Sequence, residues 1–311
     1  MKKIYLHMGA HKTGTTFLQA CVSLGKEKFA SQRISIINRQ DMIDEEVVFE
    51  NLWGYLEGDL TLSHAVKNSK GQLYQDIVAS GNNVVISNED LFKNIRKFGD
   101  FYSKASKGIE FFQNLFEDYE IHVVFYIRNQ IDYVSSIYTQ FVHLGRSYSF
   151  NEFLGGELPK HLNWYKAVKK MEDVMSKDRI HVETYESIIE VGESQFYERF
   201  LNLLGVVNTD QFTGDAEQVR NGRKANRSFS AVAIQIFRNA APLLEKNDRL
   251  KLRRYLQNNL STATHDRARF FSDERAARLR SYYSKSNEKL IKEWNITCGI
   301  DSYNKQSSES A

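Results

Sequence analysis

Five short apolar segments are the feature of this chain that most restricts its fold. They read KIYLHM, RISII, NVVIS, IHVVFYI and RIHVETY, and each has the length and composition of a buried strand. Stretches with helical periodicity lie between them, which is the order expected of strand–helix–strand crossovers and a parallel sheet. The uninterrupted run VVFYI also favours a strand covered on both faces. The sequence therefore predicts an α/β fold.

The expected helices fall between and after these strands. Beyond Ser194 the pattern becomes mostly helical, and SQFYERFLNLLGV ends at Gly205, a residue that suits a helix terminus. We predict one domain over residues 1–300, helical from about residue 194, followed by a polar, disordered tail over 301–311. The acidic, amphipathic segment RQDMIDEEVVFENLWGYLEGDL is not assigned. Helices are expected at 15–24, 65–80, 108–118, 131–144, 162–175, 229–244, 246–260 and 272–294.

Composition limits the classes of function. With 41% hydrophobic and 26% charged residues, the 311-residue chain is not of the disordered class. Its two cysteines, Cys21 and Cys298, lack the spacing of metal ligands and fit a reducing compartment. We find neither a signal-peptide core nor a membrane-spanning segment, so a cytoplasmic protein is expected. The net charge of +3 is small, and no nucleic-acid partner is predicted.

The distribution of charge says more than the total. Between Gln218 and Glu293, Lys and Arg outnumber Asp and Glu by 18 to 7. The solvated faces of long helices account for such an excess. A field that attracts an anionic cofactor or a glycan accounts for it equally well.

A glycine-containing loop follows the first strand. The stretch HMGAHKTGTTFLQ places Gly9 and Gly14 in the register of the P-loop pattern G-x-x-x-x-G-K-[ST], with Thr16 at the last position. Thr15 occupies the lysine position, and Lys12 lies three residues earlier, inside the loop. The first-turn N–H groups and the dipole of the following helix still attract a phosphate. A lysine displaced in this way suits a shorter anion than a triphosphate.

The sequence HKTGTT resembles the 5′-phosphosulfate loop of sulfotransferases that use 3′-phosphoadenosine 5′-phosphosulfate (PAPS), usually written P-K-x-G-T-T. His11 stands where proline is usual, as in a bacterial-type branch. The resemblance implies a P-loop-like, three-layer α/β fold with a central, mostly parallel sheet flanked by helices. It implies PAPS as cofactor, with adenosine 3′,5′-bisphosphate (PAP) as product, and Lys12 neutralising charge on the leaving phosphate oxygen. The residues implied in holding the 5′-phosphosulfate are Lys12, Thr13, Gly14, Thr15 and Thr16.

A second stretch, VVFYIRNQIDYVSSIYTQF, places Arg128 directly after a buried strand, where ligands bind in open α/β sheets. Ser136 follows eight residues later on the expected helix, and an arginine with a nearby hydroxyl can hold a phosphate. The arrangement resembles the family's 3′-phosphate motif. Asn129 matches that motif, whereas Gln130 replaces its usual proline. Ser135 is an alternative to Ser136.

Two weaker matches follow. RIHVETYESI resembles the family's strand that ends in Tyr-Glu, at Tyr185 and Glu186, although both residues are interpreted here as a structural strand end. The family also has a late basic loop that closes over the 3′-phosphate and adenine. RNGRKANRSFSAVAI is a basic segment of that kind, and we assign Arg223 and Lys224 in it to cofactor binding.

A carboxylate completes the predicted site. Sulfuryl transfer needs an activated acceptor hydroxyl, for which one positioned general base suffices and no metal is required. In NNVVISNEDLF, Glu89 follows a strand at the edge expected to carry the anion-binding residues, so we predict that Glu89 is the base. Sulfotransferases acting on glycans are similar in using glutamate, whereas the cytosolic small-molecule branch uses histidine. Asp90 better suits a helix N-terminus. His11 is the alternative catalytic residue, ahead of His7.

The predicted function is transfer of the sulfuryl group from PAPS to a hydroxyl of a carbohydrate, such as a polysaccharide or glycolipid. Aromatic residues in LNWYKAV and SIYTQF suit either stacking on sugars or a protein core. The alternative is a P-loop kinase or nucleotide hydrolase using ATP and magnesium, in which VVISNED would end a metal-binding strand. A non-catalytic binding protein that keeps the fold is a third possibility. Thr15 in the lysine position disfavours the kinase.

Overall fold

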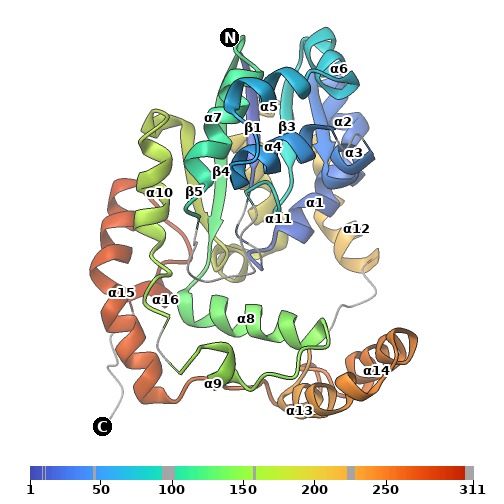
Figure 1. The fold of residues 1–311 in the computed structure, drawn as a ribbon, viewed down its shortest axis with the longest axis vertical. Coiled ribbons are helices and arrows are strands. Elements are labelled where there is room, and N and C mark those ends of the chain that lie inside the picture. The colour runs from blue at the N-terminus through green and yellow to red at the C-terminus, as the bar shows by residue number, and fades with distance from the viewer. Residues whose placement is uncertain are drawn as a thin grey trace. The chain divides into compact units, whose positions relative to one another are not determined.

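Five strands form a single parallel sheet (Figure 1) in the order β2-β3-β1-β4-β5. The structure is a computed structural model that describes residues 1–8, 10, 12–44, 47–92, 102–156, 159–222 and 228–304. All four strand pairings are parallel, which confirms the predicted α/β class. The strands are β1 Lys2–His7, β2 Ile34–Asn38, β3 Asn83–Ser87, β4 Tyr119–Ile127 and β5 Ile180–Thr184.

The two faces of the sheet are covered by different helices. On one face, Tyr5, Val85 and Tyr126 pack in a core with apolar side chains of α1 (Thr15–Leu24) and α11 (Ser187–Leu203). On the other face, the ring of Phe125 lies 4.9 Å from that of Tyr102 and 5.8 Å from that of Trp164, between ring centroids. Successive side chains of a strand point to opposite faces, so the near-continuous apolar strands follow from helices on both sides.

The chain divides into two compact units that alternate along the sequence. The first unit contains the sheet and comprises Met1–Arg128, His161–Arg220 and Ser286–Asn304. The second comprises Asn129–Lys160 and Asn221–Lys285. Further helices that lie in or begin in the first unit are α2 Lys26–Ser31, α3 Arg39–Asp44, α4 Val47–Glu57, α5 Leu62–Asn68, α6 Gln72–Ser80, α7 Ala105–Leu115, α10 Trp164–Glu172, α12 Asp215–Gly222 and α16 Asp301–Asn304.

The second unit is helical and has its own apolar core. Tyr138, Phe229, Phe237 and Leu256 are among the buried residues of that core. Its helices are α8 Gln130–His143, α9 Phe150–Phe153, α13 Ala231–Ala240, α14 Lys246–Asn259 and α15 Asp273–Glu293, the last of which continues into the first unit. Along the part of the chain that the structure describes, no helix combines the length and apolar character needed to cross a membrane.

Several helices differ from the prediction in their bounds. The helix expected at 65–80 is two helices, α5 and α6, because Gly71 between them adopts an extended conformation. The acidic segment that was not assigned forms α3 and α4. Within α11, Gly192 interrupts the helix with φ of 78°.

The segment predicted as a disordered tail begins with an ordered turn of helix. Asp301–Asn304 form α16, and the side chain of Tyr303 is buried. The prediction relied on the average polarity of the segment, in which Tyr303 is an aromatic exception. Residues 305–311 lie outside the described part of the chain.

Candidate functional site

The loop after β1 lies at the topological switch point of the sheet, where the strand order reverses. β1 is the middle strand, with β3 on one side and β4 on the other. Ligands of open parallel sheets bind at such a switch point, beyond the carboxyl ends of the strands. Glu89 follows β3, Arg128 follows β4 and Tyr185 follows β5, so all three lie at the edge that carries the loop.

Two left-handed residues shape this loop. Lys12 has φ of 67° and Gly14 has φ of 81°. Gly14 is the N-cap residue of α1 and has no side chain with which to cap the helix, while its carbonyl accepts from the N–H groups of Phe17 and Leu18. Thr13 is buried and donates to the Ala10 carbonyl, while Thr16 is exposed. Backbone turns of this kind, at a helix N-terminus, attract anions.

A hydrogen bond joins the loop to the carboxylate after β3. Thr15 Oγ1 donates to Glu89 Oε2 at 2.7 Å, and Thr15 is buried whereas Glu89 is partly exposed. Asp90 is held differently, because Arg39 Nε donates to its Oδ2 at 2.9 Å. The structure therefore brings Glu89, and not Asp90, against the first turn of α1.

An arginine joins the loop from the other side. Arg128 Nη1 donates to the carbonyl oxygen of Lys12 at 2.8 Å, although the two residues are 116 positions apart. The Arg128 guanidinium also lies over the Tyr185 ring, 4.5 Å from its centroid. Arg128 is 9% exposed, and its Nε is a buried donor with no hydrogen-bond partner among the described residues. A buried, unsatisfied guanidinium donor fits an anionic ligand at this position.

Trp164 fixes the backbone of Arg128. Its indole Nε1 donates to the Arg128 carbonyl oxygen at 2.7 Å, and its side chain is fully buried. This tryptophan of LNWYKAV therefore belongs to the core and presents no ring for a sugar. It orients the point where β4 ends, because a buried indole N–H requires an acceptor.

Tyr185 contacts both the loop after β1 and Arg128. Its backbone N–H donates to the Ile127 carbonyl at 2.8 Å and so extends the pairing of β5 with β4. A Cβ placed on Gly14 would lie 3.2 Å from Tyr185 Cδ2, so the ring packs closely against the loop glycine. The ring thus packs against the loop at Gly14 and lies under the Arg128 guanidinium.

His7, the last residue of β1, is buried in the core. It is fully buried, its Nδ1 is 2.8 Å from Ser87 Oγ, and its ring lies 5.0 Å from that of Phe200. Burial lowers the pKa of His7 to about 4, against the opposing effect of the Glu89 carboxylate. At neutral pH the imidazole is therefore uncharged, and its position inside the core excludes it as a base for an external acceptor.

We expect His7 to make the stability of the protein depend on pH. Its ordinary pKa of 6.5 falls to about 4 in the folded state, so the unfolded chain binds the proton more tightly. The free energy of unfolding should then fall by about 2 kcal/mol as the pH drops from 7 to 5 because of His7 alone. In His7→Gln, the free energy of unfolding measured by urea denaturation should change less between these two pH values than it does in the wild type. The control variant His64→Gln changes an exposed histidine and should show the same change in the free energy of unfolding as the wild type. The same change in His7→Gln would contradict the role of His7.

The remaining predicted site residues are placed only in part. Ser136 lies on α8 in the second unit, and its competitor Ser135 donates to the Ile131 carbonyl at 2.7 Å, within the helix. His11, Arg223 and Lys224 lie outside the described residues, as does Gly9.

The contribution of Tyr185 and Trp164 was not anticipated from the sequence. Tyr185 was interpreted as a structural strand end, yet its ring contacts both Gly14 and Arg128. A signal was available, because Tyr185 directly follows a strand in the same way as Arg128 does. Trp164 carried no such signal, since its contact with Arg128 depends on how α10 packs on the sheet.

Comparison with known proteins gives a weak structural likeness. No family model matches the chain, and no curated protein matches it. A sulfotransferase from Alicyclobacillus acidocaldarius is similar in structure, with a TM-score of 0.48 and 12% sequence identity, over 96% of this chain and 98% of that one.

Proposed function

We propose that this protein is a PAPS-dependent sulfotransferase. The observation that carries the proposal is the pair of contacts that flank the loop after β1. On one side Thr15 bonds the Glu89 carboxylate, and on the other Arg128 bonds the Lys12 carbonyl. A base, an anion-binding turn and a cationic group are thus joined at one edge of the sheet, which is the set that transfer of an anionic group requires.

The loop favours a phosphosulfate over a nucleoside triphosphate. In a P-loop nucleotidase the residue at the start of the helix is a lysine that reaches the outer phosphates. Here that residue is Thr15, and its hydroxyl is directed to Glu89. The charge comes instead from Lys12, inside the turn, where it would lie beside a short anion.

The proposed step moves one sulfuryl group. The acceptor oxygen attacks sulfur in line as the bond between sulfur and the bridging phosphate oxygen breaks, and Glu89 takes the hydroxyl proton. Lys12 and the N–H groups at the start of α1 stabilise the negative charge that remains on the phosphate. Bound PAPS would supply the activated sulfuryl group. Arg128 would hold the 3′-phosphate, and Ser136 stays a prediction from sequence for the same phosphate.

We propose a carbohydrate hydroxyl as the acceptor. The support is the glutamate at the position of the base, together with the resemblance of the loop to that of bacterial-type sulfotransferases. Transfer of labelled sulfate from PAPS across a panel of glycans and phenols tests this. Labelling of glycans alone supports the assignment, whereas labelling of phenols alone overturns it.

Binding of nucleotides separates the proposed function from a kinase. We expect the protein to bind PAP without magnesium, and to bind it more tightly than AMP, which lacks the 3′-phosphate. Tight binding of ATP that depends on magnesium, with no preference for PAP over AMP, would instead identify a nucleotide-triphosphate enzyme. Isothermal titration calorimetry with the three nucleotides provides the comparison.

Arg128→Ala should weaken PAP binding by about 10- to 100-fold, since a hydrogen bond to a charged group contributes about 1.5–3 kcal/mol. AMP is the matched control ligand. Loss of the bond between Arg128 and Lys12 would loosen the loop and weaken both nucleotides, whereas loss of a 3′-phosphate contact weakens PAP alone. An unchanged ratio of PAP to AMP affinity in this variant would remove Arg128 from the 3′-phosphate site.

A further inference from the structure

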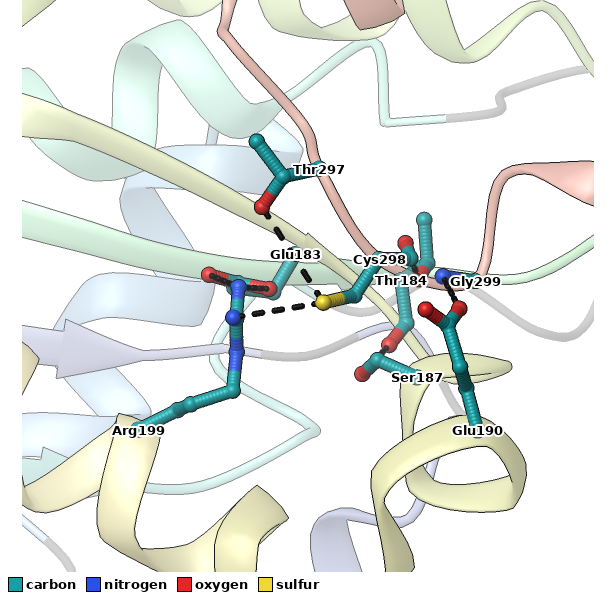
Figure 2. Close-up of polar contacts among 8 residues, drawn as sticks. All are labelled: Glu183, Thr184, Ser187, Glu190, Arg199, Thr297, Cys298 and Gly299. Carbon is teal, nitrogen blue, oxygen red and sulfur yellow. Dashed lines mark hydrogen bonds and ion pairs between the residues drawn. The ribbon is translucent and has the colours of Figure 1, made fainter.

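The segment after α15 packs along the end of β5. We call residues 296–303 the C-terminal strap. Figure 2 shows Thr184, Glu190 and Arg199 turned toward this strap. Thr184 Oγ1 donates to the Cys298 carbonyl at 2.7 Å, and Arg199 Nη1 lies 3.3 Å from Cys298 Sγ.

Gly299 allows the strap to approach β5 and α11 at backbone distance. Its φ is 68°, in the left-handed region, and its N–H donates to the Glu190 carboxylate. A Cβ on this residue would lie 2.3 Å from Thr184 Oγ1 and 2.5 Å from the Ser187 nitrogen. Any side chain would therefore displace the strap from the end of the strand.

A buried hydrogen bond anchors the last turn of the strap. Tyr303 Oη donates to Glu186 Oε2 at 3.0 Å, and the two residues are 4% and 9% exposed. Glu186 is the N-cap residue of α11 and directly follows Tyr185. A buried carboxylate needs hydrogen-bond donors, so the phenol helps to hold the turn between β5 and α11.

Tyr185 connects this turn to the ligand site. Its ring packs against Gly14 and beneath the Arg128 guanidinium. Residues 184 and 186 on either side of it bond the strap, through Cys298 and Tyr303 respectively. The strap therefore fixes both neighbours of the side chain that touches the loop and the arginine.

We propose that the C-terminal strap sets the affinity of the site for an adenosine bisphosphate by fixing Tyr185, with Tyr303 as a positioning residue. The inference rests on the proposed function for the identity of the ligand. Coupling of this kind is reciprocal. A ligand that binds more tightly when Tyr185 is fixed must therefore also stabilise the bound position of the strap.

Tyr303→Phe should bind PAP about 3- to 10-fold more weakly than the wild type, because the substitution removes the hydrogen bond to Glu186 and keeps the ring. Tyr55→Phe is the matched control. Tyr55 Oη also donates to a carboxylate, Glu110 Oε2, at 2.7 Å, on the α4 and α7 side of the first unit. Calorimetric titration should give the control variant the wild-type affinity. Equal affinities in all three proteins would overturn the inference.

The thiol of Cys298 reports the position of the strap directly. It is partly exposed, whereas Cys21 is fully buried, so iodoacetamide should modify Cys298 first. We expect PAP to slow this modification several-fold in the wild type and less in Tyr303→Phe. Gly299→Ala, with the strap displaced, should react quickly whether or not PAP is present.

These outcomes separate the two proposals. If the wild-type protein binds PAP, either an absence of protection of Cys298 or an unchanged affinity in Tyr303→Phe overturns the role of the strap alone. Wild-type protein that does not bind PAP overturns the proposed function, and this inference with it.

Discussion

Glu89→Gln is expected to slow sulfuryl transfer by about 10²- to 10⁴-fold, the range for loss of a positioned general base. The amide cannot take a proton from the acceptor hydroxyl. It can still accept the hydrogen bond that Thr15 Oγ1 now donates to Glu89 Oε2, so the start of α1 should keep its conformation. Rates of labelled-sulfate transfer at saturating PAPS measure the effect, with PAP affinity as the check that the site is intact.

Two variants distinguish the role of the Glu89 carboxylate from the roles of neighbouring residues. Thr15→Val removes the hydrogen bond to Glu89 and one hydroxyl of the loop but leaves the carboxylate, so at saturating PAPS it should retain far more activity than Glu89→Gln. Asp90→Asn changes a neighbouring acid that is paired with Arg39, and it should transfer sulfate at close to the wild-type rate. If Asp90→Asn is the slow variant and Glu89→Gln is not, the base has been assigned to the wrong residue.

Lys12→Ala is expected to lower the turnover number by about 10²- to 10³-fold, the usual loss when one group that stabilises developing charge is removed. Alanine carries the same Cβ as lysine, so the substitution adds no strain at φ of 67°. The carbonyl that accepts from Arg128 also remains. The structural consequence should therefore be small and the chemical one large.

Circular dichroism and thermal unfolding should show Lys12→Ala to be folded. Lys26→Ala is the matched control, because Lys26 forms a surface ion pair with Asp41, with Nζ and Oδ2 at 3.5 Å. That variant should keep the wild-type turnover number. Near-normal turnover in Lys12→Ala would falsify the role proposed for this lysine.

Local sequence patterns predicted the sheet and the edge of it at which the candidate site lies. The five apolar segments are the five strands, and the helix expected at 15–24 is α1 with those bounds. Their success has a physical reason, since burial of a strand on two faces and a glycine before a helix are both set by adjacent residues. The convergence of Lys12, Glu89 and Arg128 on one sheet edge followed from the rule that parallel strands end together.

Contacts between distant segments were beyond local patterns. The hydrogen bond from Arg128 to the Lys12 carbonyl joins residues 116 positions apart, and the support that Trp164 gives to Arg128 depends on the packing of α10. The burial of Tyr303 was not predicted because its neighbours in the sequence are polar. Such features arise from tertiary structure, which overrides the average preference of a segment.

The place of β1 in the sheet has a consequence for folding kinetics. The first strand of the chain is the middle one, and its His7 meets Ser87, 80 positions later, while Leu6 pairs with Val123. During synthesis β1 cannot pair with β3 until about 80 more residues have emerged, and its other edge stays open until β4 follows. Pairings of such high sequence separation form slowly, so the apolar strand is exposed to association with other chains for longer.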